Sequence, residues 1–218
     1  MIHLIVIGTR AIEDPTTNDV ATAIDAEPHV NDVLVRRCNG VAELLRAIAA
    51  VRAEHGPIDI LDIVDHAGPG LQHIGDDVLF STSEDPCQPL IGADTAKTIA
   101  ESLSPTAHVR LLGCATSLAV PNFEEESETT RPAVLPSLTS RGQLLLFKLG
   151  AALGRSRTAF GTLRPTTALD FGSGGLMPRL ENEILYSSLA ALDYQAPTES
   201  ERLSSYGIIS GQNCFPVV

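Results

Sequence analysis

The chain begins with a short run, Ile2 to Ile7, in which nearly every residue is isoleucine, leucine or valine. A run without alternation of polar and apolar residues is typical of a strand buried on both faces of a parallel sheet. Further apolar strands are predicted at Val33 to Val35 and at Ile58 to Val64, and helical spacing predicts a helix from Val41 to about Glu54 between them. Strand, helix and strand in this order predict a right-handed parallel crossover.

The same alternation continues along the rest of the chain. Its predicted elements are a helix capped by Asp94 from Thr95 to Leu103, a strand from Val109 to Leu112, a helix from Ser140 to Leu153, a strand from Thr158 to Leu163, a sixth strand from Ala168 to Phe171 and a helix from Leu180 to Leu192. We therefore expect a doubly wound α/β fold, with a mostly parallel sheet of about six strands between helices (an α/β/α sandwich). A length of 218 residues fits a single domain, residues 1–218.

Net charge and hydropathy argue against some classes of partner and indicate the cellular compartment. The net charge of −12 argues against a nucleic acid or an anionic membrane, because both require a basic face. No window approaches the ~20 apolar residues that span a bilayer, and the first residues lack the basic region of a signal peptide. We expect a cytoplasmic protein with unpaired thiols, because its cysteines are far apart and form no CxxC pair: Cys38, Cys87, Cys114 and Cys214.

One segment is unlike the rest of the chain. Residues 122–130, NFEEESETT, are acidic and almost without apolar side chains, and Pro121 and Pro132 bracket them. Such a composition cannot bury enough surface to order itself, so we expect a mobile acidic surface loop at about residues 121–137. A solvated loop is the simpler interpretation, and a processing or gating segment is the functional one.

Two reactive side chains directly follow predicted strands. His66 stands in LDIVDHAGPG and Cys114 in VRLLGCATS, and the carboxyl ends of neighbouring parallel strands meet at one edge of a sheet. An imidazole beside a thiol can take its proton and so generate the nucleophilic thiolate. Backbone N–H groups of Ala67, Gly68 and Cys114 are candidates for the oxyanion hole that such a reaction needs.

These two motifs together resemble those of the caspase-like cysteine peptidases, which include caspases, metacaspases, legumains, gingipains and bacterial CHAT domains. The family's pattern is an apolar strand ending in His-Gly and a later apolar strand ending in Cys. The resemblance implies a cysteine endopeptidase in which His66 and Cys114 form the catalytic dyad, with a protein or peptide substrate and no metal or organic cofactor. Alanine stands at position 67, where the family usually has glycine. A bacterial protein that works with an activating or regulatory protein partner is a further expectation.

The sequence leaves open whether the substrate side chain recognised by the site is acidic or basic. In caspases, arginines from comparable strand ends bind an acidic side chain on the acyl side of the scissile bond (P1), and by this resemblance Arg10 and Arg164 are candidate substrate-binding residues. Asp170 is the candidate for binding a basic P1 residue instead. Leu112, two residues before the cysteine, replaces an acidic residue that favours basic P1 side chains in several family members.

Other functions remain as alternatives. A non-catalytic caspase-like module that binds a partner through the same cleft would agree with Ala67, and a flavodoxin-like ligand-binding or signalling domain would bury Cys114 away from His66. The polar residues between positions 66 and 87 match no usual zinc or calcium spacing, so no metal site is expected. The glycine cluster at 172–175 lacks the following Lys-Ser/Thr of a phosphate loop and is interpreted as a turn.

Overall fold

The computed structural model of the chain describes residues 1–10, 14–26, 33–82, 88–114, 116–117, 141–154 and 156–188. The acidic loop expected at about residues 121–137 lies outside these residues, as do Cys87 and Cys214. None of the described helices is long and apolar enough to cross a bilayer.

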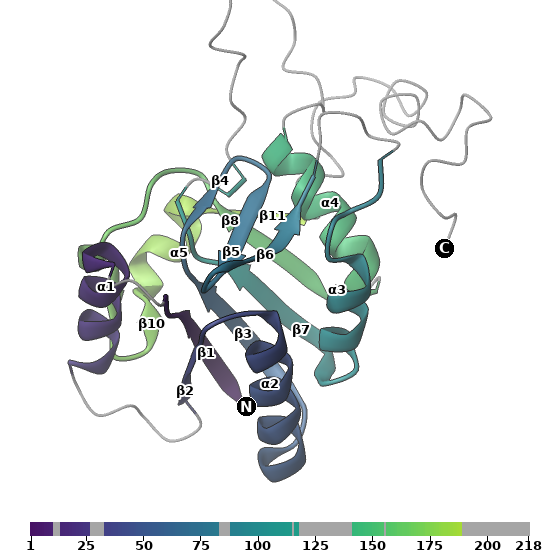
Figure 1. Cartoon of the computed structure of the whole chain (residues 1–218), viewed down its shortest axis with the longest axis horizontal. Helices are drawn as coiled ribbons and strands as arrows, with labels where there is room; N and C mark the ends of the chain where they lie inside the picture. Colours follow the sequence, from purple (N-terminus) through teal and green to yellow (C-terminus); the bar gives the residue numbers. More distant parts are fainter. Residues whose placement is uncertain are drawn as a thin grey trace, which may run out of the picture.

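A mostly parallel sheet of six strands forms the centre of an α/β fold (Figure 1). Its order is β11-β8-β7-β3-β1-β2. Neighbouring strands from β2 to β8 in this order are parallel, and β11 is antiparallel to β8. The strands are β1 (His3–Gly8), β2 (Val33–Cys38), β3 (Ile58–Val64), β7 (Leu103–Leu111), β8 (Thr158–Thr162) and β11 (Leu185–Ser187).

Helices cover both faces of this sheet. They are α1 (Pro15–Asp25), α2 (Val41–His55), α3 (Ala93–Ala100), α4 (Arg141–Leu153) and α5 (Pro178–Ile184). Buried side chains of α2, α3 and α4 share one apolar cluster with every second residue of the central strands, such as Leu4 and Leu61. Those of α1 and α5 pack on the opposite face, against residues such as Ile5 and Val64. All six residues of β1 are buried, which confirms the interpretation of its continuous apolar run.

Two small sheets lie outside the main one. After β3, the chain forms a three-stranded antiparallel sheet of β4 (Ala67–Gly68), β5 (Leu71–Ile74) and β6 (Asp77–Ser81). This sheet is not evident from the sequence, because its strands are too short to show clear alternation of polar and apolar residues. The other small sheet pairs β9 (Phe171–Gly172) with β10 (Gly175–Leu176).

The C-terminal part of the described chain differs from the sequence expectation. Residues Ala168–Asp170 form a 3-10 turn, η2, instead of a sixth strand. The sixth strand is β11, which interrupts the helix expected from Leu180 to Leu192 after α5. The helix is interrupted because a distant strand offers backbone partners: Leu185, Tyr186 and Ser187 pair with the edge of β8.

The region around α3 also corrects the expected boundaries. Gly92, with φ of 89°, is the residue that precedes α3, so Asp94 lies in the first turn and is not the cap. The helix ends at Ala100, and β7 begins at Leu103, well before the expected Val109. Helix α1 was not predicted at all, although Asp14 followed by Pro15 is a common helix-start signal.

A buried cluster of charges crosses the sheet on the side of α5. Asp62 on β3 is fully buried, and its carboxylate accepts hydrogen bonds from the Arg110 guanidinium at 2.5 and 2.6 Å. Glu181 on α5 also pairs with Arg110, at 2.6 Å, and His3 contacts Asp62 at 2.9 Å. Burial alone would raise the pKa of Asp62, but Arg110 and His3 hold it below its usual range. The cluster therefore links three strands to the helix that precedes β11.

Candidate active site

Adjacent strands bring the two reactive residues to one edge of the sheet. β3 and β7 pair in parallel, with Ile63 opposite Leu111, and the Leu112 N–H donates to the Ile63 carbonyl at 2.8 Å. His66 follows β3 and Cys114 follows β7, so both lie beyond the carboxyl ends of neighbouring strands. The expected adjacency of the two strands is confirmed.

Gly113 allows the two strand ends to approach closely. A Cβ placed on this glycine would lie 2.2 Å from the Ala67 Cβ, 2.5 Å from the Asp65 carbonyl oxygen and 3.2 Å from the Ala67 nitrogen. These distances leave no room for any side chain at position 113. The backbone before Cys114 therefore lies directly against the turn that carries His66.

Hydrogen bonds join the backbone on either side of Cys114 to the end of β8. The Thr116 hydroxyl donates to the Leu111 carbonyl at 3.1 Å, and the Thr162 amide donates to the Thr116 hydroxyl at 2.9 Å. The Thr162 hydroxyl donates to the Gly113 carbonyl, and the Ser117 hydroxyl donates to the Thr162 carbonyl at 2.8 Å. Since these groups are buried, the hydrogen bonds hold the position of Cys114 from both sides.

His66 and Cys114 line the same pocket. It is a depression on the surface with about 310 Å³ of space, a volume that includes open solvent. The residues that line it are Thr16, Thr17, Val20, Val64, Asp65, His66, Leu112, Cys114 and Thr166. The Cys114 thiol is half-buried and forms no disulfide, and it donates a long hydrogen bond to the Thr166 carbonyl, at 3.9 Å. Access from solvent is what a reactive thiol needs and what a core thiol lacks.

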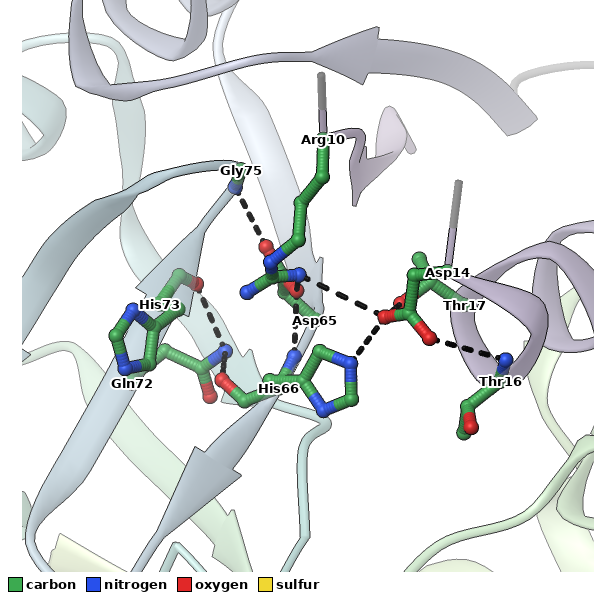
Figure 2. Close-up of polar contacts among 9 residues, drawn as sticks. All are labelled: Arg10, Asp14, Thr16, Thr17, Asp65, His66, Gln72, His73 and Gly75. Atoms are coloured by element: carbon green, nitrogen blue, oxygen red, sulfur yellow. Dashed lines mark hydrogen bonds and ion pairs between the residues drawn. The ribbon is translucent and has the colours of Figure 1, made fainter. Parts of the chain in front are cut away.

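The His66 ring is held by a carboxylate that the sequence analysis missed. Its Nε2 atom is hydrogen-bonded to the Asp14 carboxylate, and the other ring nitrogen is on the side turned away from Asp14 (Figure 2). Asp14 is the N-cap of α1 and also accepts hydrogen bonds from the Thr16 amide at 3.1 Å and the Thr17 hydroxyl at 2.7 Å. The first turn of α1 therefore fixes the carboxylate that orients the imidazole.

These contacts favour the ionised form of Asp14. Its partial burial alone would raise the pKa, but the hydrogen bonds from Thr17 and His66 outweigh this effect and lower it from 3.8 to about 2. Asp14 is therefore an ionised hydrogen-bond partner that holds the imidazole of His66 in place.

Asp65 is the buried anchor of the turn that carries His66. Its carboxylate accepts hydrogen bonds from the His66 amide and the Gly75 amide, both at 2.6 Å, and pairs with Arg10 at 2.8 Å. Asp65 is therefore an acceptor of backbone N–H groups at this turn. Arg10 lies 3.8 Å from Asp14 as well, so its guanidinium lies between two carboxylates (Figure 2).

The other two candidate specificity residues pair with each other. Both guanidinium nitrogens of Arg164 bond to Asp170, at 2.7 and 3.1 Å, and the Thr167 amide donates to Asp170 at 2.9 Å. The hydrogen bond between them lowers the pKa of Asp170 and raises that of Arg164. The roles of Arg10, Arg164 and Asp170 in binding substrate stay predictions. In this structure each of the three has an internal ionic partner.

Of the residues expected around an oxyanion, Ala67 lies against Gly113, the residue before Cys114. Ala67 and Gly68 form β4, so both have the extended conformation that any residue adopts, and alanine is not strained at position 67. The His66 carbonyl accepts the His73 amide at 3.0 Å, which ties β4 to β5. The Ala67 methyl occupies the space that Gly113 leaves empty, so the pair Ala67 and Gly113 is sterically matched.

Among the described residues, no group of three or more histidine, cysteine, aspartate or glutamate side chains is placed to hold a metal ion. Asp77 instead accepts the Val41 amide at 2.9 Å at the start of α2. Cys38 is buried, and burial together with Glu43 raises the pKa of its thiol to about 11.

Comparisons of the chain with protein-family models, with curated proteins and with solved structures give no significant match. The assignment of a function therefore depends on the geometry described above.

Proposed function

We propose that this chain is a caspase-like cysteine endopeptidase that uses a Cys114–His66 dyad. The observation that carries the proposal is the shared pocket: a half-buried thiol and an imidazole line it from the ends of two adjacent parallel strands. The hydrogen bond that Asp14 accepts from His66 supports the proposal, because the base of such a dyad is commonly oriented by a third group.

The proposed reaction begins with activation of the thiol. His66 keeps the proton on Nε2 and donates it in a hydrogen bond to Asp14, so the lone pair of the neutral ring is on Nδ1. This Nδ1 atom takes the proton of the Cys114 thiol and becomes protonated. The thiolate attacks the peptide carbonyl and forms a carbon–sulfur bond, while the carbonyl π electrons move onto oxygen. Backbone N–H groups of Ala67, Gly68 and Cys114 are the proposed donors to this oxyanion.

The second half of the reaction returns the enzyme to its starting state. The tetrahedral intermediate collapses, the C–N bond breaks, and the protonated His66 gives its proton to the leaving amine. A water molecule, deprotonated by His66, then attacks the thioester and releases the carboxylic acid and the thiol. Because thiol and imidazole carry every proton transfer, the reaction needs no metal or organic cofactor.

We also propose a compartment, a substrate class and a protein partner for this activity. We place the enzyme in a bacterial cytoplasm, where reducing conditions keep Cys114 as a thiol, acting on a protein or peptide with an activating or regulatory protein partner. A non-catalytic partner-binding module is the second candidate. It is favoured by one contact, the hydrogen bond of the thiol to the Thr166 carbonyl instead of to His66.

Alkylation by iodoacetamide separates these two candidates. At neutral pH we expect Cys114 to react at least about tenfold faster than Cys38, whose buried thiol has a pKa of about 11 and serves as the internal control. His66→Ala should slow the reaction of Cys114 and leave that of Cys38 unchanged. Peptide mapping by mass spectrometry measures both rates, and equal rates at the two cysteines would contradict the enzyme proposal.

Hydrolysis itself is measured with a positional-scanning fluorogenic peptide library. The wild-type chain should cleave members of this library, and Cys114→Ala should cleave none. An activity that survives in Cys114→Ala would exclude Cys114 as the nucleophile.

A further inference from the structure

The described lining of the pocket beside Cys114 has apolar and hydroxyl surfaces but no unpaired charge. Val20, Val64 and Leu112 contribute apolar side chains to it, and Thr16 and Thr166 are among its hydroxyl-bearing residues. Val64 and Leu112 are buried at the strand ends, each two residues before His66 or Cys114 along the chain. A substrate side chain next to the attacked carbonyl would therefore contact aliphatic groups and hydroxyls.

Every described charge around this pocket already has a partner. Asp65 pairs with Arg10, and Asp14 pairs with His66. The bidentate pair of Arg164 with Asp170 lies in the segment that also contributes Thr166 to the pocket. A charged side chain entering the pocket would lose part of its hydration without meeting an unpaired opposite charge among the described residues, which costs several-fold to many-fold in affinity.

From these contacts we propose that the site selects an uncharged P1 side chain, aliphatic or hydroxyl-bearing, in place of the acidic or basic residue considered from the sequence. The inference rests on the proposed peptidase function and names its substrate class. Valine and threonine fit the surfaces that line the pocket, because the side chains of Leu112 and Val64 receive methyl groups and Thr166 can exchange hydrogen bonds with a hydroxyl.

Binding to the Cys114→Ala chain tests this specificity without requiring turnover. Fluorescence polarisation compares labelled peptides that differ only at P1, with valine, threonine, aspartate or lysine. We expect the valine and threonine peptides to bind at least about tenfold more tightly than the aspartate and lysine peptides. Tighter binding of a charged peptide, equal binding of all four, or binding of none would overturn the inference.

Charge variants at Thr16 supply the matched control. Thr16 is exposed in the first turn of α1 and lines the pocket, so its substitution leaves the core intact. In the Cys114→Ala background, Thr16→Glu should strengthen binding of the lysine peptide and Thr16→Lys that of the aspartate peptide, each about tenfold at low salt. No change in either variant would show that P1 does not occupy this pocket.

The two proposals fail in different ways. Slow alkylation of Cys114 in the wild-type chain contradicts the peptidase function, whereas the peptide affinities of Cys114→Ala report only on the pocket. Fast alkylation together with preferred binding of a charged peptide would preserve the function and exclude the neutral specificity.

Discussion

The carboxylate of Asp14 is hydrogen-bonded to Nε2 of His66, although 52 positions separate them along the chain. Asp14 also caps α1, and it is less exposed than the imidazole that it contacts, with 18% against 42% of the side chain accessible. One side chain therefore both begins a helix and orients the proposed catalytic base, so its two roles can be separated by substitution.

Asp14→Asn should reduce peptidase activity while largely preserving the fold. Asparagine is as good an N-cap as aspartate, but it places no negative charge beside His66. We expect kcat/KM to fall by about tenfold to a hundredfold, whereas Asp14→Ala should also lose about 1 kcal/mol of stability. Steady-state kinetics and thermal unfolding measure the two effects.

Asp94→Asn provides the control for this substitution. Asp94 likewise lies in a first helical turn, but its side chain is 99% exposed and pairs only with Lys97 among the contacts described. Its removal should leave kcat/KM unchanged. An identical loss of activity in both variants would show that Asp14 acts through overall charge and not through His66.

The stability that Asp14 contributes should disappear in acid. Its pKa in the fold is about 2, against 3.8 for the ordinary side chain, so the folded state favours the ionised form. The contribution is complete above about pH 4 and is lost as the pH falls toward about 2. Urea unfolding should show the stability difference between the wild-type chain and Asp14→Asn shrinking over this range. A difference that stays constant with pH would contradict it.

Gly113→Ala should destabilise the chain and disturb the site together. The added Cβ would lie 2.2 Å from the Ala67 Cβ and 2.5 Å from the Asp65 carbonyl, and backbone atoms cannot move away cheaply. We expect a loss of about 2–4 kcal/mol in the free energy of unfolding, measured with urea. Gly172→Ala, whose added Cβ meets nothing within 4 Å, is the comparison and should change stability far less.

Arg110→Met should be among the most destabilising single substitutions. It would leave the Asp62 carboxylate buried without its main cationic partner, at a cost of about 3–5 kcal/mol. Arg46→Met is the matched control, because Arg46 is 74% exposed and reaches Glu43 only at 3.8 Å. Urea unfolding measures both. A second substitution, Asp62→Leu, should restore part of the stability lost in Arg110→Met.

The central strands and helices were predictable because their signal is local. β3 runs from Ile58 to Val64 as expected, and α2 and α4 differ from their expected ranges by a residue at an end. The placement of His66 and Cys114 at one edge followed from the same reasoning, since parallel strands joined by one crossover tend to be neighbours. Their common pocket confirms that the two residues lie together, and their catalytic roles stay proposals.

Elements that depend on distant partners were not predictable. β11 takes its conformation from the edge of β8, and the strands β4 to β6 stabilise one another across short turns. The start of α1 is an instructive case, because the signal of Asp14 followed by Pro15 was present in the sequence. Two threonines directly after it have weak helix propensity, which made the helix easy to overlook.

The sequence by itself determined the parallel α/β architecture and the pair of reactive residues at its carboxyl edge, because apolar periodicity and strand ends are properties of neighbouring residues. Only the tertiary structure decided how the charges around that edge combine. Arg10 pairs with Asp65, Asp14 is hydrogen-bonded to His66, and Arg164 pairs with Asp170. Charge pairing depends on distances of a few ångströms between separately folded segments, and these pairings leave the described lining of the pocket without an unpaired charge.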